Sequence, residues 1–413
     1  MTQTVRVATL LSLSAATLLA SGYRIPEQSL NSVALSAAYV AGANGADASY
    51  YNPANMSFMA NGAYTEVALT YINLPKVNFE GTSASMNGDS KEEEFLMPNL
   101  HYVSPMMGNW RYGLSITAPA GLSKRWDEAF SKATAEEFTL KVIEVNPTVS
   151  YLVNDQLSLG FGLRGVYTDG VVKSNASNAL TRDLTGDSID FGYNLALSYK
   201  PIKDVTLAAT YRSKVDLTVE GDAKLNYLGG MGGSPGSYNG SASVTIPLPA
   251  SLALAAAYTY DKTTVEFVYE RTYWSSYKDL DFDYDGTLSN AVLVAKFDNP
   301  IAKNWKDSNA YRIGLSHQCT DNLKMMIGFA IDNSPVPSNT LGFELPDSDA
   351  KLYSIGFEYK LSSNLKVGLA YLYDDKEDRT VSNYNVTTNP SGPSGTFTDS
   401  SAHLLTASFK YKF

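Results

Sequence analysis

The C-terminal strand of this 413-residue chain alternates between apolar and polar residues and ends in an aromatic residue. Its apolar positions are Leu405, Ala407, Phe409, Tyr411 and Phe413, and its polar positions are Thr406, Ser408, Lys410 and Lys412. Successive side chains of a strand point to opposite faces, so one face is apolar and the other carries two lysines. Lipid-facing and lumen-facing residues alternate in this way in transmembrane β-barrels, whereas lysines are rarely buried in a soluble core. The pattern predicts a membrane strand that ends at Phe413.

Residues 1–22 have the composition of an export signal. Arg6 supplies a positive charge, residues 7–20 form a short apolar stretch, and small residues follow up to Gly22. The apolar stretch is too short to cross a bilayer as a helix, and no later segment approaches the required length. We expect cleavage after Ala20 or Gly22 and a mature chain with no transmembrane helix.

Composition favours a membrane barrel and excludes other classes. Aromatic residues make up 12% of the chain, with 28 Tyr, and charged residues only 18%, as expected for a barrel with aromatic girdles. The net charge of -10 disfavours nucleic-acid binding, which needs a basic surface. Cys319 is the only cysteine, so no intrachain disulfide forms. A soluble, secreted array of β-sandwiches remains an alternative on composition alone.

Period-two alternation recurs along the chain and predicts about fourteen strands in an antiparallel up-and-down barrel, an all-β fold. The predicted strands lie near 63–74, 94–105, 110–118, 139–153, 156–168, 187–200, 204–220, 240–260, 263–282, 307–319, 322–332, 349–361, 364–375 and 400–413. Six short polar turns alternate with seven long loops, and we expect the short turns on the periplasmic side. Within 205–219 the odd-numbered apolar residues are assigned to lipid, and Arg212 and Lys214 to the lumen.

Residues 23–60 break this pattern. They are rich in Ala, Ser, Asn and Gly, and they lack both period-two alternation and the charge that is typical of disorder. An ordered segment of this length before the first strand has one place to be buried, which is inside the barrel. We therefore expect three parts: the signal peptide (1–22), an N-terminal hatch of short helices that plugs the lumen (23–60), and the barrel (61–413).

Several short motifs occur in an order that resembles one known family. They are Glu27-Gln28-Ser29, Asn52-Pro53-Ala54-Asn55-Met56, Ala118-Pro119-Ala120-Gly121-Leu122, Asn146-Pro147, Tyr211-Arg212-Ser213-Lys214, Trp305-Lys306-Asp307, Ser334-Pro335-Val336-Pro337 and Leu345-Pro346-Asp347. In this order they resemble the FadL/TodX-type outer-membrane transporters of long-chain fatty acids and hydrocarbons. The resemblance covers nearly the whole mature chain. It implies fourteen strands, an N-terminal hatch, an external hydrophobic groove, and a lateral opening in the third strand.

The end of the predicted third strand is irregular for physical reasons as well. Pro119 lacks the N–H that a ladder needs, and Gly121 has no side chain to seal the wall. Ladder pairing should therefore fail around Ala118, Pro119, Ala120 and Gly121, where the resemblance implies the lateral opening. The alternative is that Pro119 only ends the strand and begins a loop.

The tripeptide Asn52-Pro53-Ala54 also has two interpretations. Asn followed by Pro favours a turn, in which the Asn side chain bonds nearby backbone groups. As an isolated tripeptide it indicates a generic turn. Just before the first barrel strand, we expect Asn52, Pro53 and Ala54 to anchor the hatch to the inner wall.

A lipid with a carboxylate needs an apolar tunnel and one or two basic groups. The alternation assigns Arg164, Arg212, Lys214 and Arg312 to the lumen as candidates. They equally fit a ladder of ion pairs with the lumen carboxylates that holds the barrel and hatch together. Apolar residues in the predicted loop 119–138 are candidates for capturing ligand at the outer rim; they are Leu122, Trp126 and Phe130.

No sequence feature supports catalysis, a cofactor or a metal site. The only histidines are His101, His317 and His403, on three different predicted strands, and no nucleophile or metal-ligand motif is present. An outer-membrane lipase that uses His403 is the enzymatic alternative.

The predicted function is passive transport of fatty acids or aromatic hydrocarbons across the bacterial outer membrane. The predicted partners are the hydrophobic ligand, outer-membrane lipid and lipopolysaccharide, and the outer-membrane assembly machinery, which would bind the Phe413 strand; the barrel is expected to be a monomer. Two other classes stay open: a water-filled porin for polar solutes, which should lack a long plug, and a non-transporting surface protein.

Overall fold

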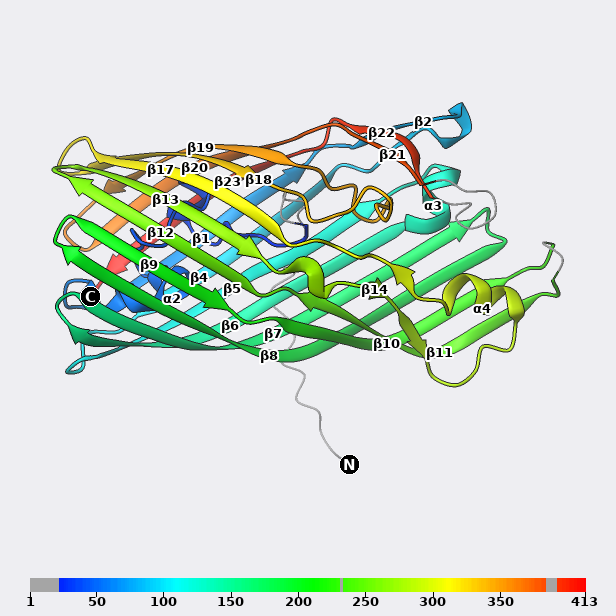
Figure 1. Ribbon diagram of the computed structural model, residues 1–413, viewed down its shortest axis with the longest axis horizontal. Coiled ribbons are helices and arrows are strands. Elements are labelled where there is room, and N and C mark those ends of the chain that lie inside the picture. The colour runs from blue at the N-terminus through cyan, green and yellow to red at the C-terminus, as the bar shows by residue number, and fades with distance from the viewer. Residues whose placement is uncertain (1–21, 231–232, 384–391) are drawn as a thin grey trace.

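The computed structural model describes residues 22–230, 233–383 and 392–413 (Figure 1). Seventeen strands form one antiparallel sheet that closes on itself, because the first strand pairs with the last. Three wall spans consist of two strands each, so the described wall has fourteen spans. The prediction of a closed barrel of about fourteen strands is confirmed. The predicted signal peptide lies outside the described residues except for Gly22, and it stays a prediction.

The wall spans follow the chain around the ring. They are β1 (Tyr64–Leu74), β4 (Glu93–Val103), β5 (Trp110–Arg125), β6 (Glu137–Asn154), β7 (Leu157–Ala176), β8 (Leu180–Ile202), β9 (Val205–Arg212) with β10 (Val215–Tyr227), β11 (Gly236–Leu248) with β12 (Ser251–Tyr260), β13 (Thr263–Thr272) with β15 (Phe282–Tyr284), β17 (Ser308–Gln318), β18 (Leu323–Asp332), β19 (Ala350–Lys360), β20 (Leu365–Lys376) and β23 (Ser401–Lys412). Each span is antiparallel to its neighbours.

One face of the wall is apolar and exposed. In β1, Val67 and Leu69 are nearly half exposed, while Ala68 between them and Glu66 and Thr70 on either side are buried. The C-terminal strand repeats the pattern, with Phe409 exposed. Because exposed apolar and buried polar residues alternate, the outer surface suits lipid and the lumen is polar. Within the described residues, no helix has both the length and the apolar character needed to cross a membrane.

The two ends of the barrel differ. Tight turns and the C-terminus lie at one end, and longer connections lie at the other (Figure 1). The long connections contain α3 (Ala129–Ala135), α4 (Ala291–Phe297), η2 (Ala84–Met86) and η3 (Trp274–Ser276), the paired strands β14 (Asp279–Leu280) and β16 (Ile301–Ala302), and a small sheet of β2 (Asn78–Gly81), β3 (Gly88–Asp89), β21 (Arg379–Ser382) and β22 (Ser394–Thr398). We call this the outer end, because long loops of such barrels face outward.

The hatch segment, residues 23–60, lies inside the ring in the half nearer the tight turns (Figure 1). It contains α1 (Leu30–Ala34), α2 (Ala48–Tyr51) and η1 (Pro53–Phe58). Helix α1 contacts β18, β19, β20 and β23, whereas η1 contacts β5, β6, β7 and β8 across the lumen. The segment contacts strands on several sides of the ring and lies across the lumen at this level, with a polar cavity left between it and β13, β17, β18, β19, β20 and β23.

Several strands differ from the prediction in their parts toward the outer end of the barrel. The strand predicted at 204–220 is interrupted at Ser213 and Lys214, and the alternation changes face there. Val215 and Leu217 are buried inside, whereas Lys214 is exposed and pairs with Asp216 at 2.9 Å. The assignment of Lys214 to the lumen is therefore wrong, because the break in the ladder moves every later side chain to the other face.

The outer ends of the strands are also longer than predicted. The predicted fifth-strand loop, 169–186, is a strand hairpin whose turn includes Ser177 and Asn178 in left-handed conformation, with φ of 53° and 59°. The predicted span 263–282 stops at Thr272, and a separate β15 resumes the pairing. The alternation could not locate these ends, because the strands extend past the lipid and pack apolar residues inside.

Candidate functional site

The hatch segment is held by polar groups of the inner wall. Glu266 on β13 accepts hydrogen bonds from three consecutive backbone N–H groups of the hatch, those of Val40 and Ala41 at 2.6 Å each and that of Gly42 at 2.9 Å. Arg111 on β5 donates to the hatch carbonyl oxygens of Met56 and Met59, at 2.9 Å each. These contacts satisfy backbone groups that the short helices leave free.

The predicted anchor tripeptide packs against the wall. The Asn52 amide donates to the Val40 carbonyl at 3.0 Å and to the Ser198 hydroxyl of β8 at 2.8 Å. Pro53 begins η1, where its missing N–H costs nothing. The Ala54 carbonyl accepts from the hydroxyl of Ser158 at 2.8 Å. The structure thus brings all three residues together at the junction of hatch and wall.

Four inward-facing glycines on consecutive strands make room for α1. They are Gly314 on β17, Gly328 on β18, Gly356 on β19 and Gly368 on β20. A Cβ at Gly328 would lie 2.1 Å from the backbone carbonyl carbon of Leu35. In the sequence, the signal for these glycines is one glycine on each of four successive strands.

Strand β5 turns inward at the predicted irregularity. From Thr117 to Lys124 every residue is buried, so the alternation between lipid and lumen is lost. Pairing with β6 continues across a register shift between Thr117 and Ala120. Pairing with β4 stops at Leu100 and Ile116. The prediction that the strand ends near residue 118 is wrong, as is the alternative that Pro119 begins a loop, because β6 and the hatch bond β5 through this stretch.

The start of the hatch segment takes the place of β4 beside this part of β5. The Ile25 N–H donates to the Pro119 carbonyl and the Gly121 N–H to the Tyr23 carbonyl, both at 2.9 Å. The Gln28 side chain accepts from the Ala118 N–H at 2.8 Å and donates to its carbonyl at 2.9 Å. Its amide therefore imitates a neighbouring strand.

The interruption between β4 and β5 is closed again at its outer end. Arg125 pairs with Glu93 at 3.0 Å, and Ser90 and Trp126 form an isolated bridge. We call the stretch between the Leu100–Ile116 pair and the Glu93–Arg125 pair the seam. Along the seam, the wall is completed by the hatch and not by a β4–β5 ladder.

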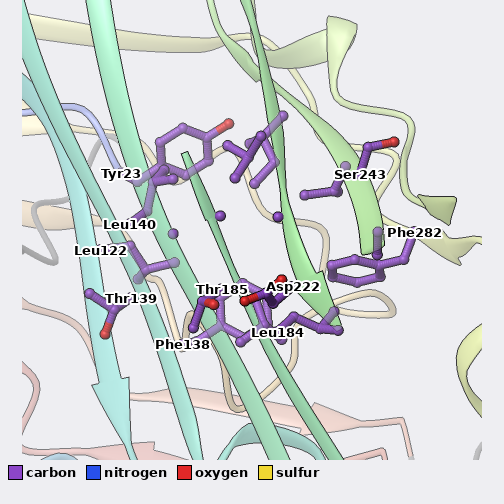
Figure 2. Close-up of a pocket in the computed structure, with 18 of the residues that line it drawn as sticks. Tyr23, Leu122, Phe138, Thr139, Leu140, Leu184, Thr185, Asp222, Ser243 and Phe282 are labelled. Carbon is purple, nitrogen blue, oxygen red and sulfur yellow. The ribbon is translucent and has the colours of Figure 1, made fainter. Parts of the chain in front are cut away.

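An apolar cavity, which we call the inner cavity, lies beside β5 above the hatch (Figure 2). Its empty volume is about 620 Å³. The lining comes from the hatch and from several strands and includes Tyr23, Leu122, Phe138, Leu140, Leu184, Ile246, Tyr277 and Phe282. Asp222 is its only lining residue with a carboxylate, and no Lys, Arg or His lines it. Leu122, predicted as a residue of an external loop, lies instead on β5 in this lining.

A larger cavity, the outer cavity, lies among the long connections and has an empty volume of about 1900 Å³. Residues of α4, of β7 and β8, and of the segment 339–344 line it, and Phe138 lines both cavities. Phe343 belongs to this lining and stacks edge-on against Trp126 and Phe130, at centroid distances of 5.1 and 5.8 Å. Trp126 is fully buried. These two predicted rim residues thus pack around Phe343.

The three predicted lumen arginines are paired with carboxylates of the protein. Arg164 and Arg212 both pair with Glu144, the first at 2.8 Å. Arg312 pairs with Asp332 at 2.9 Å. None of the three arginines lines the inner or the outer cavity. The geometry favours the predicted alternative of ion pairs: these pairs join strands of the wall, and Arg24 of the hatch segment pairs with Glu270 of β13 at 2.8 Å.

The hatch also buries an acid without a hydrogen-bond partner. Both carboxylate oxygens of Glu27 are buried and unpaired in the described structure. Burial raises the pKa of Glu27 to about 7, although the positive charge of Arg312 opposes this shift. Within the described residues, no group of three or more metal-ligating side chains is arranged to hold a metal ion.

Comparison with known proteins agrees with this architecture. Residues 11–413 match the family described as outer membrane protein transport protein (OMPP1/FadL/TodX). The long-chain fatty acid transport protein of Escherichia coli strain K12 is 24% identical over 369 residues, which cover 78% of this chain and 80% of that protein. Outer membrane protein P1 of Haemophilus influenzae (strain ATCC 51907 / DSM 11121 / KW20 / Rd) is 24% identical over 315 residues, or 67% and 65% of the two chains.

Solved structures share the fold. A Pseudomonas aeruginosa FadL homologue superposes with a TM-score of 0.82 at 19% identity and covers 95% of this chain and all of its own. The Pseudomonas putida toluene transporter TodX gives a TM-score of 0.71 at 19% identity, with 92% and 98% covered. With a family match over nearly the whole length and a closed barrel of fourteen spans, this chain belongs to the OMPP1/FadL/TodX family of outer membrane transport proteins.

Proposed function

We propose that this protein carries hydrophobic molecules, long-chain fatty acids or aromatic hydrocarbons, passively across the outer membrane. The observation that supports this most directly is the position of the inner cavity. It is apolar, it lies above the hatch segment that lies across the lumen, and two of its lining residues, Tyr23 and Leu122, border the seam. A ligand in this cavity is therefore next to the one stretch of described wall that the hatch completes.

In the proposed route, ligand enters through the outer cavity, moves into the inner cavity and displaces the start of the hatch segment from β5. It then leaves sideways through the seam into the lipid. A lateral exit is favoured because each methylene removed from water contributes about 0.8 kcal/mol, so release into the periplasm would be uphill. The hydrogen bonds of Tyr23, Ile25 and Gln28 to β5 are the contacts that must break.

The test combines cells and vesicles. A deletion strain that expresses the protein should take up labelled fatty acid or toluene at least about tenfold faster than the strain without it, the gain expected when a membrane barrier is bypassed. In liposomes, the purified barrel should admit no more sugar than protein-free liposomes, because the hatch lies across the lumen. Free sugar permeation would support the porin instead, and unchanged uptake in both strains would support a non-transporting surface protein.

A second proposal concerns assembly. We propose that the exposed C-terminal strand, which ends at Phe413, is recognised by the outer-membrane assembly machinery and that the barrel works as a monomer. Phe413 is 69% exposed beside the tight turns, which leaves it accessible.

A further inference from the structure

Arg182 is a buried cation that has no hydrogen-bond or ion-pair partner among the described residues. It lies near the outer end of β8 and is only 6% exposed. Its side chain forms no hydrogen bond or ion pair with the described residues, and its Nε is buried without an acceptor. The lumen arginines Arg164, Arg212 and Arg312 are each paired with a carboxylate. A buried charge without a partner is costly, so an anion that enters the outer cavity would stabilise Arg182.

The surroundings of Arg182 orient it for binding. The guanidinium lies over the rings of Phe282 and Phe297, with its central carbon 5.1 and 5.5 Å from the ring centroids. Such contacts hold the flat faces of the guanidinium and leave the N–H groups at its edge free to donate. The Tyr284 hydroxyl, within electrostatic range of Arg182, is also buried without a partner. Two unsatisfied donor groups therefore lie in one region.

Within residues 22–230, 233–383 and 392–413, no carboxylate forms an ion pair with Arg182. Asp183, the next residue, points to the opposite face and pairs with Lys173 at 3.8 Å. Glu344 lines the outer cavity but pairs with Lys303. The stretches outside the described residues contain neither Asp nor Glu. An anion that pairs with Arg182 would therefore come from another molecule.

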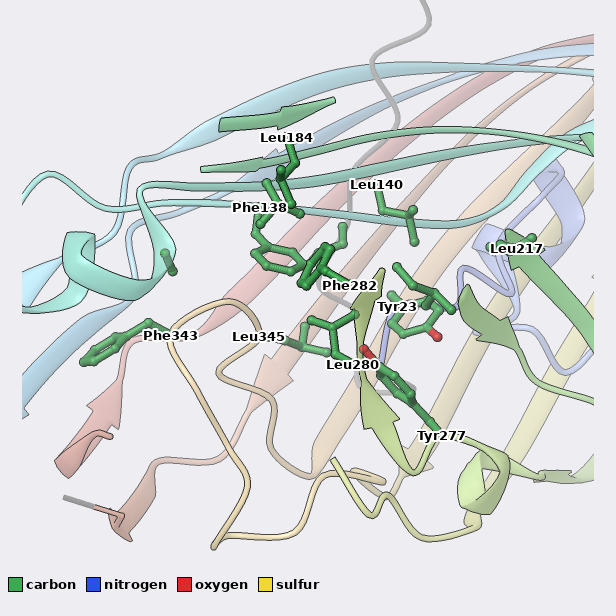
Figure 3. Packing of buried hydrophobic residues seen from close by; sticks show 14 of the residues in the cluster. Tyr23, Phe138, Leu140, Leu184, Leu217, Tyr277, Leu280, Phe282, Phe343 and Leu345 are labelled. Atoms are coloured by element: carbon green, nitrogen blue, oxygen red, sulfur yellow. The ribbon is translucent and has the colours of Figure 1, made fainter. Parts of the chain in front are cut away.

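The cavities around Arg182 determine what kind of molecule fits. Arg182 lines the outer cavity, and Leu184, two residues further on the same face of β8, lines the inner one. Phe138 borders both cavities, and Figure 3 shows Phe138, Leu184 and Phe282 side by side. The inner cavity offers apolar side chains and no basic group. A ligand that satisfies both regions has an anionic head at Arg182 and an apolar chain that reaches past Phe138.

We propose that Arg182 binds the carboxylate of a long-chain monocarboxylic acid at the passage from the outer to the inner cavity. This inference rests on the proposed function and narrows it, because a neutral hydrocarbon leaves Arg182 unpaired. Tyr284 supplies a second hydrogen bond to the same carboxylate. The chain of the acid then lies along Phe138 and Leu184 toward the seam.

The experiment compares two ligands with the same chain, hexadecanoate and its methyl ester, at about pH 8, where a carboxyl group is ionised. Binding to the full mature barrel in detergent is measured for wild type, Arg182→Met and Arg182→Lys. Arg271→Met is the matched control, because Arg271 is exposed on β13 and pairs with Asp307 outside the cavities. We expect Arg182→Met to bind hexadecanoate at least about tenfold more weakly and the ester unchanged, as for loss of a charge-assisted hydrogen bond.

The remaining variants separate the outcomes. Arg182→Lys should keep part of the preference for hexadecanoate, and Arg271→Met all of it. If Arg182→Met does not fold, Tyr284→Phe gives the same test, with a several-fold loss expected for hexadecanoate alone. The inference is overturned if folded Arg182→Met binds hexadecanoate with wild-type affinity. Where Tyr284→Phe replaces that variant, wild-type affinity in Tyr284→Phe overturns it in the same way. Neither result contradicts the proposal of hydrophobic transport. If wild type binds neither ligand, the fatty-acid part of the proposed function fails as well, and transport of aromatic hydrocarbons is the part that remains.

Discussion

At the residue scale, Glu27 stands out because its carboxylate is buried without a hydrogen bond. Arg312, Asp332 and Glu270 lie within electrostatic range, but burial dominates and raises its pKa to about 7. Because docking raises the pKa of Glu27, the docked hatch segment is more stable with Glu27 protonated than with Glu27 ionised. Docking of the hatch segment is therefore most stable below the ordinary pKa of Glu, about 4.5, and loses stability as pH rises toward 7.

This loss of docking stability with rising pH leads to a prediction for Glu27→Gln. In wild type, the amide hydrogens of α1 should lose at least about tenfold in exchange protection factor between pH 5 and pH 8, since each unit of pKa difference is a factor of ten. Glu27→Gln should lose less protection over this range than wild type, because its amide does not ionise, whereas the Glu66 and Glu266 carboxylates that accept hatch N–H groups are retained. A wild type without pH dependence, or a variant that keeps all of it, would show that Glu27 does not control docking.

At the scale of elements, the fit of α1 to the wall depends on missing side chains. Gly328 and its three neighbouring glycines bring the strand backbones close to the helix. Gly328→Leu should displace the hatch segment, because overpacking of this kind costs roughly 1–3 kcal/mol or more when the obstacle is backbone. We expect sugar permeation in liposomes to rise several-fold while the β-sheet signal in circular dichroism stays unchanged.

Gly165→Leu is the control for this substitution. Gly165 lies on β7 between Leu163 and Tyr167, which are exposed on the outer face, and the nearest atom to an added Cβ is 3.8 Å away. This variant should be as impermeable to sugar as wild type. If the Gly328→Leu barrel is as impermeable to sugar as wild type, then α1 tolerates a shift and does not seal the lumen by close packing.

At the scale of the whole molecule, the hatch segment, the wall and the inner cavity meet at the seam. Arg24 and Ala120 face each other in an antiparallel bridge, whose Cα separation suits a disulfide. In a Cys319→Ser background, which removes the exposed free thiol, Arg24→Cys with Ala120→Cys should lock the hatch to β5. Uptake of fatty acid should fall at least about tenfold when the pair is oxidised, because the lateral exit then stays closed, as for other substrate gates.

The reduced form of the same double variant is the internal control, since it carries the identical substitutions and lacks Arg24 equally. Uptake should return on addition of a thiol reductant. If oxidised and reduced proteins transport at the same rate, ligand does not leave by displacing the hatch from β5, and the lateral route is refuted. Cys319→Ser alone should behave as wild type under both conditions.

The sequence by itself determined the features that depend on one uniform environment. Lipid surrounds the whole wall, so every span must present apolar residues at every second position. Exposed apolar residues such as Phe409 and Val67 follow this rule, which can be read within a single strand. The alternation of tight and long connections, the plug before the first strand and the irregularity at Pro119 are likewise local signals. For this reason the closed barrel, its approximate strand count and its outer-membrane location were predictable from the residues.

Only the tertiary structure decided what happens inside the lumen. There, a side chain meets residues from strands far apart in sequence, so its role depends on register and on what lies opposite. Because the strand is interrupted at Ser213, Lys214 lies on the outer face. Arg164 is held in an ion pair with Glu144. Arg182 lacks such a partner, which no local pattern reveals. Alternation records contact with lipid, whereas the pairing of charges across the lumen depends on long-range geometry.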